Sequence, residues 1–259
     1  IFRLRELEQM EIEYFVKESD WARAFEEWRV AMNTWIDTVG IDRERLHEVE
    51  IGDGDRAHYS KRTIDFEFEY PFGQKELYGL AYRTDFDLSR HSEASKVDLS
   101  YRDEEATEET SKKFIPHVIE PSFGLDRTML AVLLSAYTED TMGDSPREYL
   151  KFHPRVAPIK AAVSPLLKNK PELVEKAREV YTMLKKDIPQ IMWDDNGNVG
   201  KRYRRQDEIG TPFCIVIDFD TLGETPEHKD TVTVRDRDTG EQERVPIGEL
   251  TNYIKTAIL

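Results

Sequence analysis

Alternation of apolar and polar residues opens the chain. Between Ile1 and Val16 six of the eight even positions are apolar, whereas half of the odd positions are charged. A period of two predicts a β-strand with one apolar face and one charged face. The charged face has two arginines at one end and two glutamates at the other, which suits a substrate with an anionic end and a cationic end. An edge strand with a solvated charged face explains the same pattern.

Three further patterns follow before residue 84. Large apolar residues recur every three or four positions from Trp21 to Ile36, which predicts an amphipathic helix. The polar stretch 41–57 is rich in Gly and Asp and predicts a loop. Alternation resumes at 64–70, and a turn leads from there into a second strand at 76–83. These two strands predict an antiparallel hairpin.

The middle of the chain contains a highly charged stretch, then a largely apolar one, then one with glycine and proline. Residues 92–113 are highly charged and predict an exposed connection with a short strand around Val97 to Tyr101. Residues 114–137 predict a strand, a tight turn at Gly124 and a helix. Residues 138–153 hold Gly143 and Pro146, with Pro154 next to them, and predict a linker between two domains.

Strands and helices alternate in the last part of the chain. The predicted strands are 156–163, 191–193 and 213–219, with a hairpin at 231–245, and the predicted helices are 171–186, 199–209 and 248–259. This order is typical of a small α/β domain. We therefore expect two domains, residues 1–150 and residues 151–259.

Composition limits the classes of protein. The single cysteine, Cys214, excludes an intramolecular disulfide framework and any multi-cysteine zinc site, and its apolar surroundings predict a buried core residue. No apolar stretch approaches the roughly 20 residues that span a bilayer, and no signal peptide is visible. We expect a cytoplasmic protein without a membrane partner.

The net charge of −15 is unevenly distributed. Residues 1–153 hold 20 Lys and Arg against 34 Asp and Glu, whereas residues 154–259 hold 17 against 18. An acidic chain is a poor general binder of nucleic acid. Any contact with RNA must therefore use local basic patches.

Four stretches resemble one family. Two of them resemble motifs 2 and 3 of the class II aminoacyl-tRNA synthetases: IFRLRELEQMEIEYFV (1–16) and PHVIEPSFGLDR (116–127). Their residues are most similar to those of the dimeric glycyl-tRNA synthetases of the archaeal and eukaryotic-like type. ELYGLAYRTDFDL (76–88) resembles their glycine-pocket segment. GKRYRRQDEIGTPFCIVIDFDT (200–221) resembles the anticodon-binding domain that the glycine, histidine, proline and threonine enzymes share.

The resemblance covers nearly the whole chain and implies its fold and activity. The implied fold is α+β: part of the antiparallel-sheet catalytic core in residues 1–150, then a small α/β anticodon-binding domain in residues 151–259. The implied enzyme is a glycine–tRNA ligase, which joins glycine to ATP as glycyl-adenylate and transfers it to the 3′ end of tRNA(Gly). This chemistry requires alignment and charge neutralisation rather than a covalent enzyme intermediate.

The resemblance also implies residues for ATP, which binds with Mg²⁺. Arg3 would contact the α-phosphate and the amino-acid carboxylate, and Arg127 would lie against the nucleotide on the opposite side. A planar, permanently charged guanidinium suits both roles. Glu76 matches the acid that holds Mg-ATP, although a solvated strand carboxylate is the alternative. Leu7 stands where most members have an aromatic ring that stacks on adenine; leucine has no π-face, so we expect weaker ATP binding.

The glycine site is implied by a second set of residues. Glu11 and Glu120 match the carboxylates that surround the ammonium group, and Arg83 and Ser122 match other pocket residues. Glycine is the smallest amino acid, so the pocket has only to exclude larger ones. One extra methyl group in a packed site costs about 1–3 kcal/mol.

A basic cluster marks the candidate tRNA contact. Its members surround Tyr203 and are Lys201, Arg202, Arg204 and Arg205. Basic residues next to an aromatic ring suit phosphate contact and base stacking on an RNA loop. The alternative is a solvated helix face paired with Asp207 and Glu208.

The resemblance begins within motif 2, and motif 1 is absent. We therefore expect a fragment that lacks the N-terminal part, is inactive alone and belongs to a homodimer at full length. Two other functions remain open: a non-catalytic synthetase-like accessory or nucleic-acid-binding protein, and a ligase for another small amino acid. The former is opposed by the joint presence of Arg3, Glu11, Glu76, Arg83, Glu120 and Arg127, and favoured by Leu7.

Overall fold

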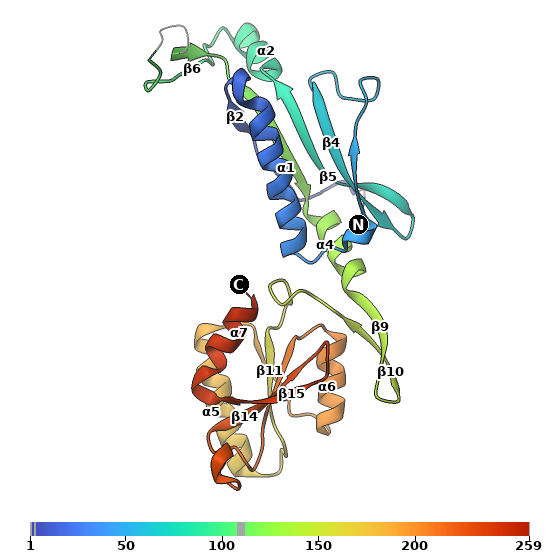
Figure 1. The fold of residues 1–259 in the computed structure, drawn as a ribbon, viewed down its shortest axis with the longest axis vertical. Coiled ribbons are helices and arrows are strands. Elements are labelled where there is room, and N and C mark those ends of the chain that lie inside the picture. Colours follow the sequence, from blue (N-terminus) through green and yellow to red (C-terminus); the bar gives the residue numbers. More distant parts are fainter. Residues whose placement is uncertain (1, 3, 108–111, 259) are drawn as a thin grey trace. The chain divides into compact units, whose positions relative to one another are not determined.

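The computed structural model describes residues 2, 4–107 and 112–258. These residues form two compact units (Figure 1). Unit 1 comprises residues 1–37 and 41–134, and unit 2 comprises residues 38–40 and 135–259. Within the described residues, none of the helices combines the length and the apolar character that crossing a membrane requires.

Unit 1 is built on an antiparallel sheet of six strands in its described residues. The strands are β1 (Gln9–Glu11), β2 (Tyr14–Val16), β3 (Leu46–Glu50), β4 (Arg62–Tyr70), β5 (Gly73–Thr84) and β8 (His117–Gly124). Their spatial order is β3-β4-β5-β8, and both β1 and β2 pair with the outer side of β8. The predicted hairpin of β4 and β5 is confirmed.

One face of this sheet is apolar and covered by helices. Helices α1 (Trp21–Thr38) and α4 (Leu125–Ala136) lie over it, and α1 runs along the sheet in Figure 1. The Trp21 ring stacks on Tyr82 with centroids 4.3 Å apart. From α4, the Thr128 hydroxyl donates to the hydroxyl of Tyr78 at 2.9 Å. The opposite face, which carries small and polar residues, is therefore left for a site.

Two predictions for unit 1 are wrong. The opening stretch is not one long strand: it forms β1 and β2, interrupted at residues 12 and 13, and residues 4–8 lie outside both. Its apolar side chains remain half exposed, Met10 by 50% and Tyr14 by 43%, because both strands lie at the sheet edge. The predicted loop 41–57 contains β3, an edge strand with only two apolar residues and hence no clear alternation.

The connection between β5 and β8 is more structured than its charge suggests. Helix α2 (Phe86–Ser95), which the sequence pattern did not predict, follows β5 directly. Strands β6 (Tyr101–Arg102) and β7 (Lys113–Phe114) then pair with each other. Part of this predicted exposed connection, residues 108–111, lies outside the described residues.

Unit 2 contains a five-stranded sheet in the order β12-β11-β13-β14-β15. The strands are β11 (Ala161–Pro165), β12 (Ile191–Trp193), β13 (Phe213–Ile217), β14 (Thr231–Asp236) and β15 (Gln242–Pro246). Strand β11 is parallel to its neighbours β12 and β13, whereas β14 is antiparallel to its neighbours β13 and β15. Helices α5 (Pro171–Asp187) and α7 (Leu250–Ile258) contribute to the apolar core, and α6 (Val199–Glu208) lies on the opposite side of the sheet (Figure 1). The predicted α/β character of this part is confirmed.

The predicted linker at 138–153 is wrong, because a β-hairpin occupies most of it. Strands β9 (Tyr137–Met142) and β10 (Ser145–Leu150) pair along their full length, and Gly143 adopts a positive φ of 61° in the turn. The hairpin groups with unit 2, so the units divide between residues 134 and 135 rather than at the predicted 150. The glycine and proline that suggested a linker lie in and beside this turn.

Candidate functional site

Sheet register assembles the candidate site from four strands. Asp65 on β4 pairs with Gly79 on β5, Gly79 pairs with Ser122 on β8, and Ser122 pairs with Glu11 on β1. Directly paired residues of neighbouring strands share one face of a sheet. The next row on this face contains Thr63, Ala81 and Glu120. The two rows line a cavity of about 340 Å³, which we call the acidic cavity.

The acidic cavity concentrates carboxylates. Its lining includes Glu11, Asp55, Asp65, Glu76 and Glu120. Burial, with the charges of Glu76 and Glu67 adding to it, raises the pKa of Asp65 to about 6. Burial also raises the pKa of Glu120, against the opposing effect of Arg83. Such surroundings favour a cationic ligand, since a positive charge relieves the repulsion among the carboxylates.

Arg83 orients one of these carboxylates from outside the cavity. Its guanidinium donates to Glu120 at 2.5 Å and to Asp87 at 2.8 Å. The same group lies 3.9 Å from the centroid of the Tyr59 ring, which stacks beneath it. Because both carboxylates already occupy Arg83, this residue positions Glu120 rather than offering a vacant cation to a substrate.

Gln9 connects two of the predicted pocket residues. Its side-chain amide donates to Glu11 at 2.7 Å and to the Ser122 hydroxyl at 2.9 Å. Gln9 also lines a second cavity of about 210 Å³, which contains Arg127 and which we call the Arg127 cavity. The two cavities share Gln9, Glu76 and Ser122. They therefore adjoin and suit a ligand with two chemically different parts.

The Arg127 cavity pairs a guanidinium with a carboxylate. Arg127 donates to the Glu76 carboxylate at 3.1 Å and to the Glu76 backbone carbonyl at 2.9 Å. Its guanidinium lies 4.5 Å from the centroid of the Phe2 ring. Leu7 lines the same cavity with 48% of its surface exposed. A nucleotide placed here meets one arginine, three acidic residues (Glu8, Glu76 and Asp126) and the aliphatic side chain of Leu7.

The predicted site residues separate into three groups. Glu11, Glu120 and Ser122 line the acidic cavity, whereas Leu7 and Arg127 line the Arg127 cavity, and Glu76 lines both. Arg83 holds Glu120 without lining either cavity. Arg3 lies outside the described residues.

Sequence patterns alone missed Gln9, Asp65, Gly79 and Ala81. Asp65 and Gln9 are single polar residues in alternating strands, and only the sheet register brings them next to Glu11. Gly79 and Ala81 had a visible signal. They are the small residues in the run Tyr-Gly-Leu-Ala-Tyr (78–82), where the alternation is between large and small side chains.

The four basic residues of the candidate tRNA contact differ in their exposure and in their hydrogen bonds. Arg202 is buried and donates to the backbone carbonyls of Pro165 and Gly197. Arg205 donates to Asp194 and to the carbonyl of Asn196. These two arginines hold the loop before α6 in place. Lys201 and Arg204 are exposed, although Arg204 also donates to the backbone carbonyl of Pro146 at 2.6 Å.

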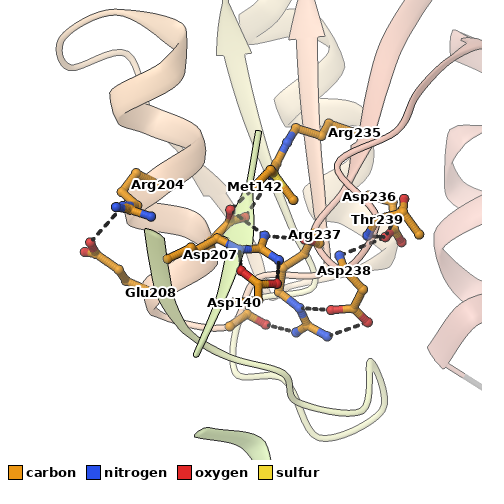
Figure 2. Close-up of polar contacts among 12 residues, drawn as sticks. Asp140, Met142, Arg204, Asp207, Glu208, Arg235, Asp236, Arg237, Asp238 and Thr239 are labelled. Carbon is orange, nitrogen blue, oxygen red and sulfur yellow. Dashed lines mark hydrogen bonds and ion pairs between the residues drawn. The ribbon is translucent and has the colours of Figure 1, made fainter. Parts of the chain in front are cut away.

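The acidic neighbours on α6 also differ. Glu208 lies 4.0 Å from Arg204 on the exposed side of the helix (Figure 2). Asp207 is buried and accepts a hydrogen bond from Arg235 of β14 at 2.8 Å (Figure 2). It also accepts one from Arg147 of β10 at 3.0 Å. The alternative of a solvated face paired with both acids is thus wrong for Asp207, which fixes the β9–β10 hairpin to the sheet.

Comparison with known proteins shows to which family the chain belongs. The family model described as "Anticodon binding domain" matches residues 160–257. The chain is 46% identical over 257 residues to a glycine–tRNA ligase of Bacillus anthracis, covering 99% of this chain and 53% of that protein. It is 44% identical to that of Deinococcus radiodurans, covering 100% and 54%, and 47% identical to that of Lachnospira eligens, covering 98% and 52%. The chain spans about half the length of these relatives, and by sequence it belongs to the family of the glycine–tRNA ligases.

Proposed function

We propose that the protein carrying this chain is a glycine–tRNA ligase, which activates glycine with ATP and transfers the glycyl group to tRNA(Gly). The observation that carries this proposal is the pair of adjoining cavities on one sheet face. One of them is acidic with a floor of small residues, and the other contains Arg127. Similarity to glycine–tRNA ligases over nearly the whole chain supports the same activity.

The acidic cavity would hold the ammonium group of glycine. Glu11 and Glu120 offer carboxylate acceptors, and Ser122, tied to Glu11 through Gln9, offers a hydroxyl. A hydrogen bond to a charged group contributes about 1.5–3 kcal/mol. Two or three such contacts bind a ligand that has no side chain to grip. Arg83 would keep Glu120 oriented for this contact.

The Arg127 cavity would hold the nucleotide. Arg127 supplies a permanent positive charge next to the phosphates, and Arg3 would supply a second one in the same role. Magnesium bound through nucleotide phosphates needs only one or two protein carboxylates. Glu76 fits this requirement, since its carboxylate lines the Arg127 cavity. Magnesium would neutralise phosphate charge there when it binds with ATP.

Unit 2 would bind the tRNA anticodon through the exposed residues Lys201 and Arg204. The match to the anticodon-binding family over residues 160–257 supports this role. We also propose that the whole protein is a cytoplasmic homodimer, as the resemblance to dimeric glycyl-tRNA synthetases implies.

ATP–pyrophosphate exchange tests the proposed function. The assay uses the protein that carries this chain, with glycine, alanine, serine and the remaining amino acids supplied one at a time. We expect exchange with glycine alone. Exchange with a different small amino acid reassigns the substrate, and no exchange with any amino acid from a folded protein favours the non-catalytic synthetase-like alternative.

A further inference from the structure

Strand β5 has an unusual pattern where it crosses the site. Tyr78, Leu80 and Tyr82 point to the apolar face and are fully buried there. The residues between them, Gly79 and Ala81, point to the acidic cavity and are the two smallest residue types. Each neighbouring strand places larger polar side chains in the same rows. The centre of the cavity floor is therefore bare backbone.

Neither backbone conformation nor internal packing explains the glycine at position 79. Gly79 is not among the glycines of the described residues with positive φ, so any amino acid can adopt its conformation. A Cβ atom added to Gly79 would meet only Glu76 Oε1, at an ordinary contact distance of 3.7 Å. Gly210 is the contrasting case, since its φ is +80° and an added Cβ would collide with the Phe152 ring.

Glycine inside a strand weakens the strand, and it commonly marks a position where a ligand approaches the backbone closely. Gly79 lies between Asp65 and Ser122, in the row that ends at Glu11. Three strand spacings separate the ends of this row, which is about 14 Å. The carboxylates at its two ends thus flank an open space directly above Gly79 and Ser122.

We propose that Gly79 is a specificity-determining residue, because the bound amino acid lies directly against its Cα. Gly79, with Ala81 beside it, would then set the depth of the amino-acid pocket. This inference rests on the proposed function and extends it: the pocket takes an α-amino acid without a side chain because the ligand is seated on the strand itself. A methyl group at position 79 would occupy the place of the ligand.

The variant Gly79→Ala tests this assignment in the protein that carries the chain. ATP–pyrophosphate exchange gives the KM values for glycine and ATP, and thermal unfolding gives the Tm. We expect the KM for glycine to rise about 5- to 150-fold, because a methyl group in a packed site displaces the ligand. The KM for ATP should stay within about two-fold, and the Tm should be unchanged or higher, since alanine suits a strand better than glycine.

Gly248→Ala is the matched control, because a Cβ atom there meets nothing within 4 Å and Gly248 lines neither cavity. All three values should stay at wild-type levels. A Gly79→Ala protein with an unchanged KM for glycine, or with a clearly lower Tm, overturns the assignment while the proposed function stands. A wild-type protein that shows no exchange with glycine overturns the proposed function and the assignment together.

Discussion

At the residue scale, Leu7 is the clearest departure from the synthetase pattern. It lines the Arg127 cavity with an aliphatic side chain, at a position where the resemblance to the class II synthetases implies an aromatic ring against adenine. We expect Leu7→Phe to lower the Kd for ATP about 2- to 10-fold, since stacking of aromatic rings contributes about 0.5–1.5 kcal/mol. Isothermal titration calorimetry measures the Kd.

Leu4→Phe controls for an added exposed ring, because Leu4 is similarly exposed but does not line the Arg127 cavity. It should leave the Kd for ATP unchanged. Equal tightening in both variants, or none in Leu7→Phe, would show that position 7 does not face the base.

The raised pKa of Asp65 predicts that the stability of the protein depends on pH. This pKa is raised to about 6, so the folded state favours the protonated form. The resulting stabilisation is complete below the ordinary pKa near 4 and is lost as the pH rises through 6. Asp65→Asn should therefore raise the Tm by a few degrees at pH 7.5, and the difference from wild type should vanish near pH 4. Thermal unfolding between pH 4 and pH 8 measures this difference.

The exposed Asp144, in the turn of the β9–β10 hairpin, provides the control. Asp144→Asn should change the Tm little at any pH in this range. If Asp65→Asn unfolds at a lower temperature than wild type at pH 7.5, its carboxylate has a stabilising partner and the argument is wrong.

At the element scale, helix α6 carries a buried acidic residue, Asp207, next to an exposed one, Glu208. Asp207 lies among Arg147 and Arg235, and all three side chains are at most 5% exposed. Removing one partner of a buried ion pair leaves an uncompensated charge and costs about 3–5 kcal/mol. Asp207→Asn should therefore lower the free energy of unfolding of unit 2 by about this amount. Hydrogen exchange of β13 amides under increasing urea measures the loss.

Glu208→Gln is the matched control on the next residue of the helix. Its side chain is 55% exposed and lies 4.0 Å from Arg204. Exposed ion pairs contribute about 0–1 kcal/mol, so β13 should keep its protection. Similar losses in both variants would mean that Asp207 is not the residue that fixes the β9–β10 hairpin.

The elements differ in how far sequence predicts them. Helix α1 and the β4–β5 hairpin were predicted because each buries one face and so shows a clean period. The β9–β10 hairpin was not, because a buried charged residue, Arg147, interrupts the apolar alternation and is held by Asp140 across the hairpin and by Asp207 of α6. The site shows the same limit. Family resemblance indicated Glu11 and Glu120, but the positions of Asp65 and Gly79 follow only from the pairing of β4, β5 and β8.

At the scale of the whole molecule, charge is divided unequally between the two units. Residues 1–134 hold 18 Lys and Arg against 30 Asp and Glu, and residues 135–259 hold 19 against 22. Neither unit attracts a polyanion by its net charge. If the protein binds tRNA as proposed, a few local contacts must supply the attraction, and exposed Lys201 is one of them.

The salt dependence of tRNA binding tests this expectation. Each phosphate contact adds about 0.7–0.9 to the slope of log K against log salt concentration. We expect a shallow slope, between about −1 and −4, from fluorescence anisotropy at roughly 50 to 200 mM salt. Lys201→Gln should reduce the slope by about one contact, whereas Lys75→Gln in unit 1 should not. A steep slope that neither substitution changes would place the tRNA on a different surface, because an interface that releases many counterions requires a basic patch larger than the one around Lys201.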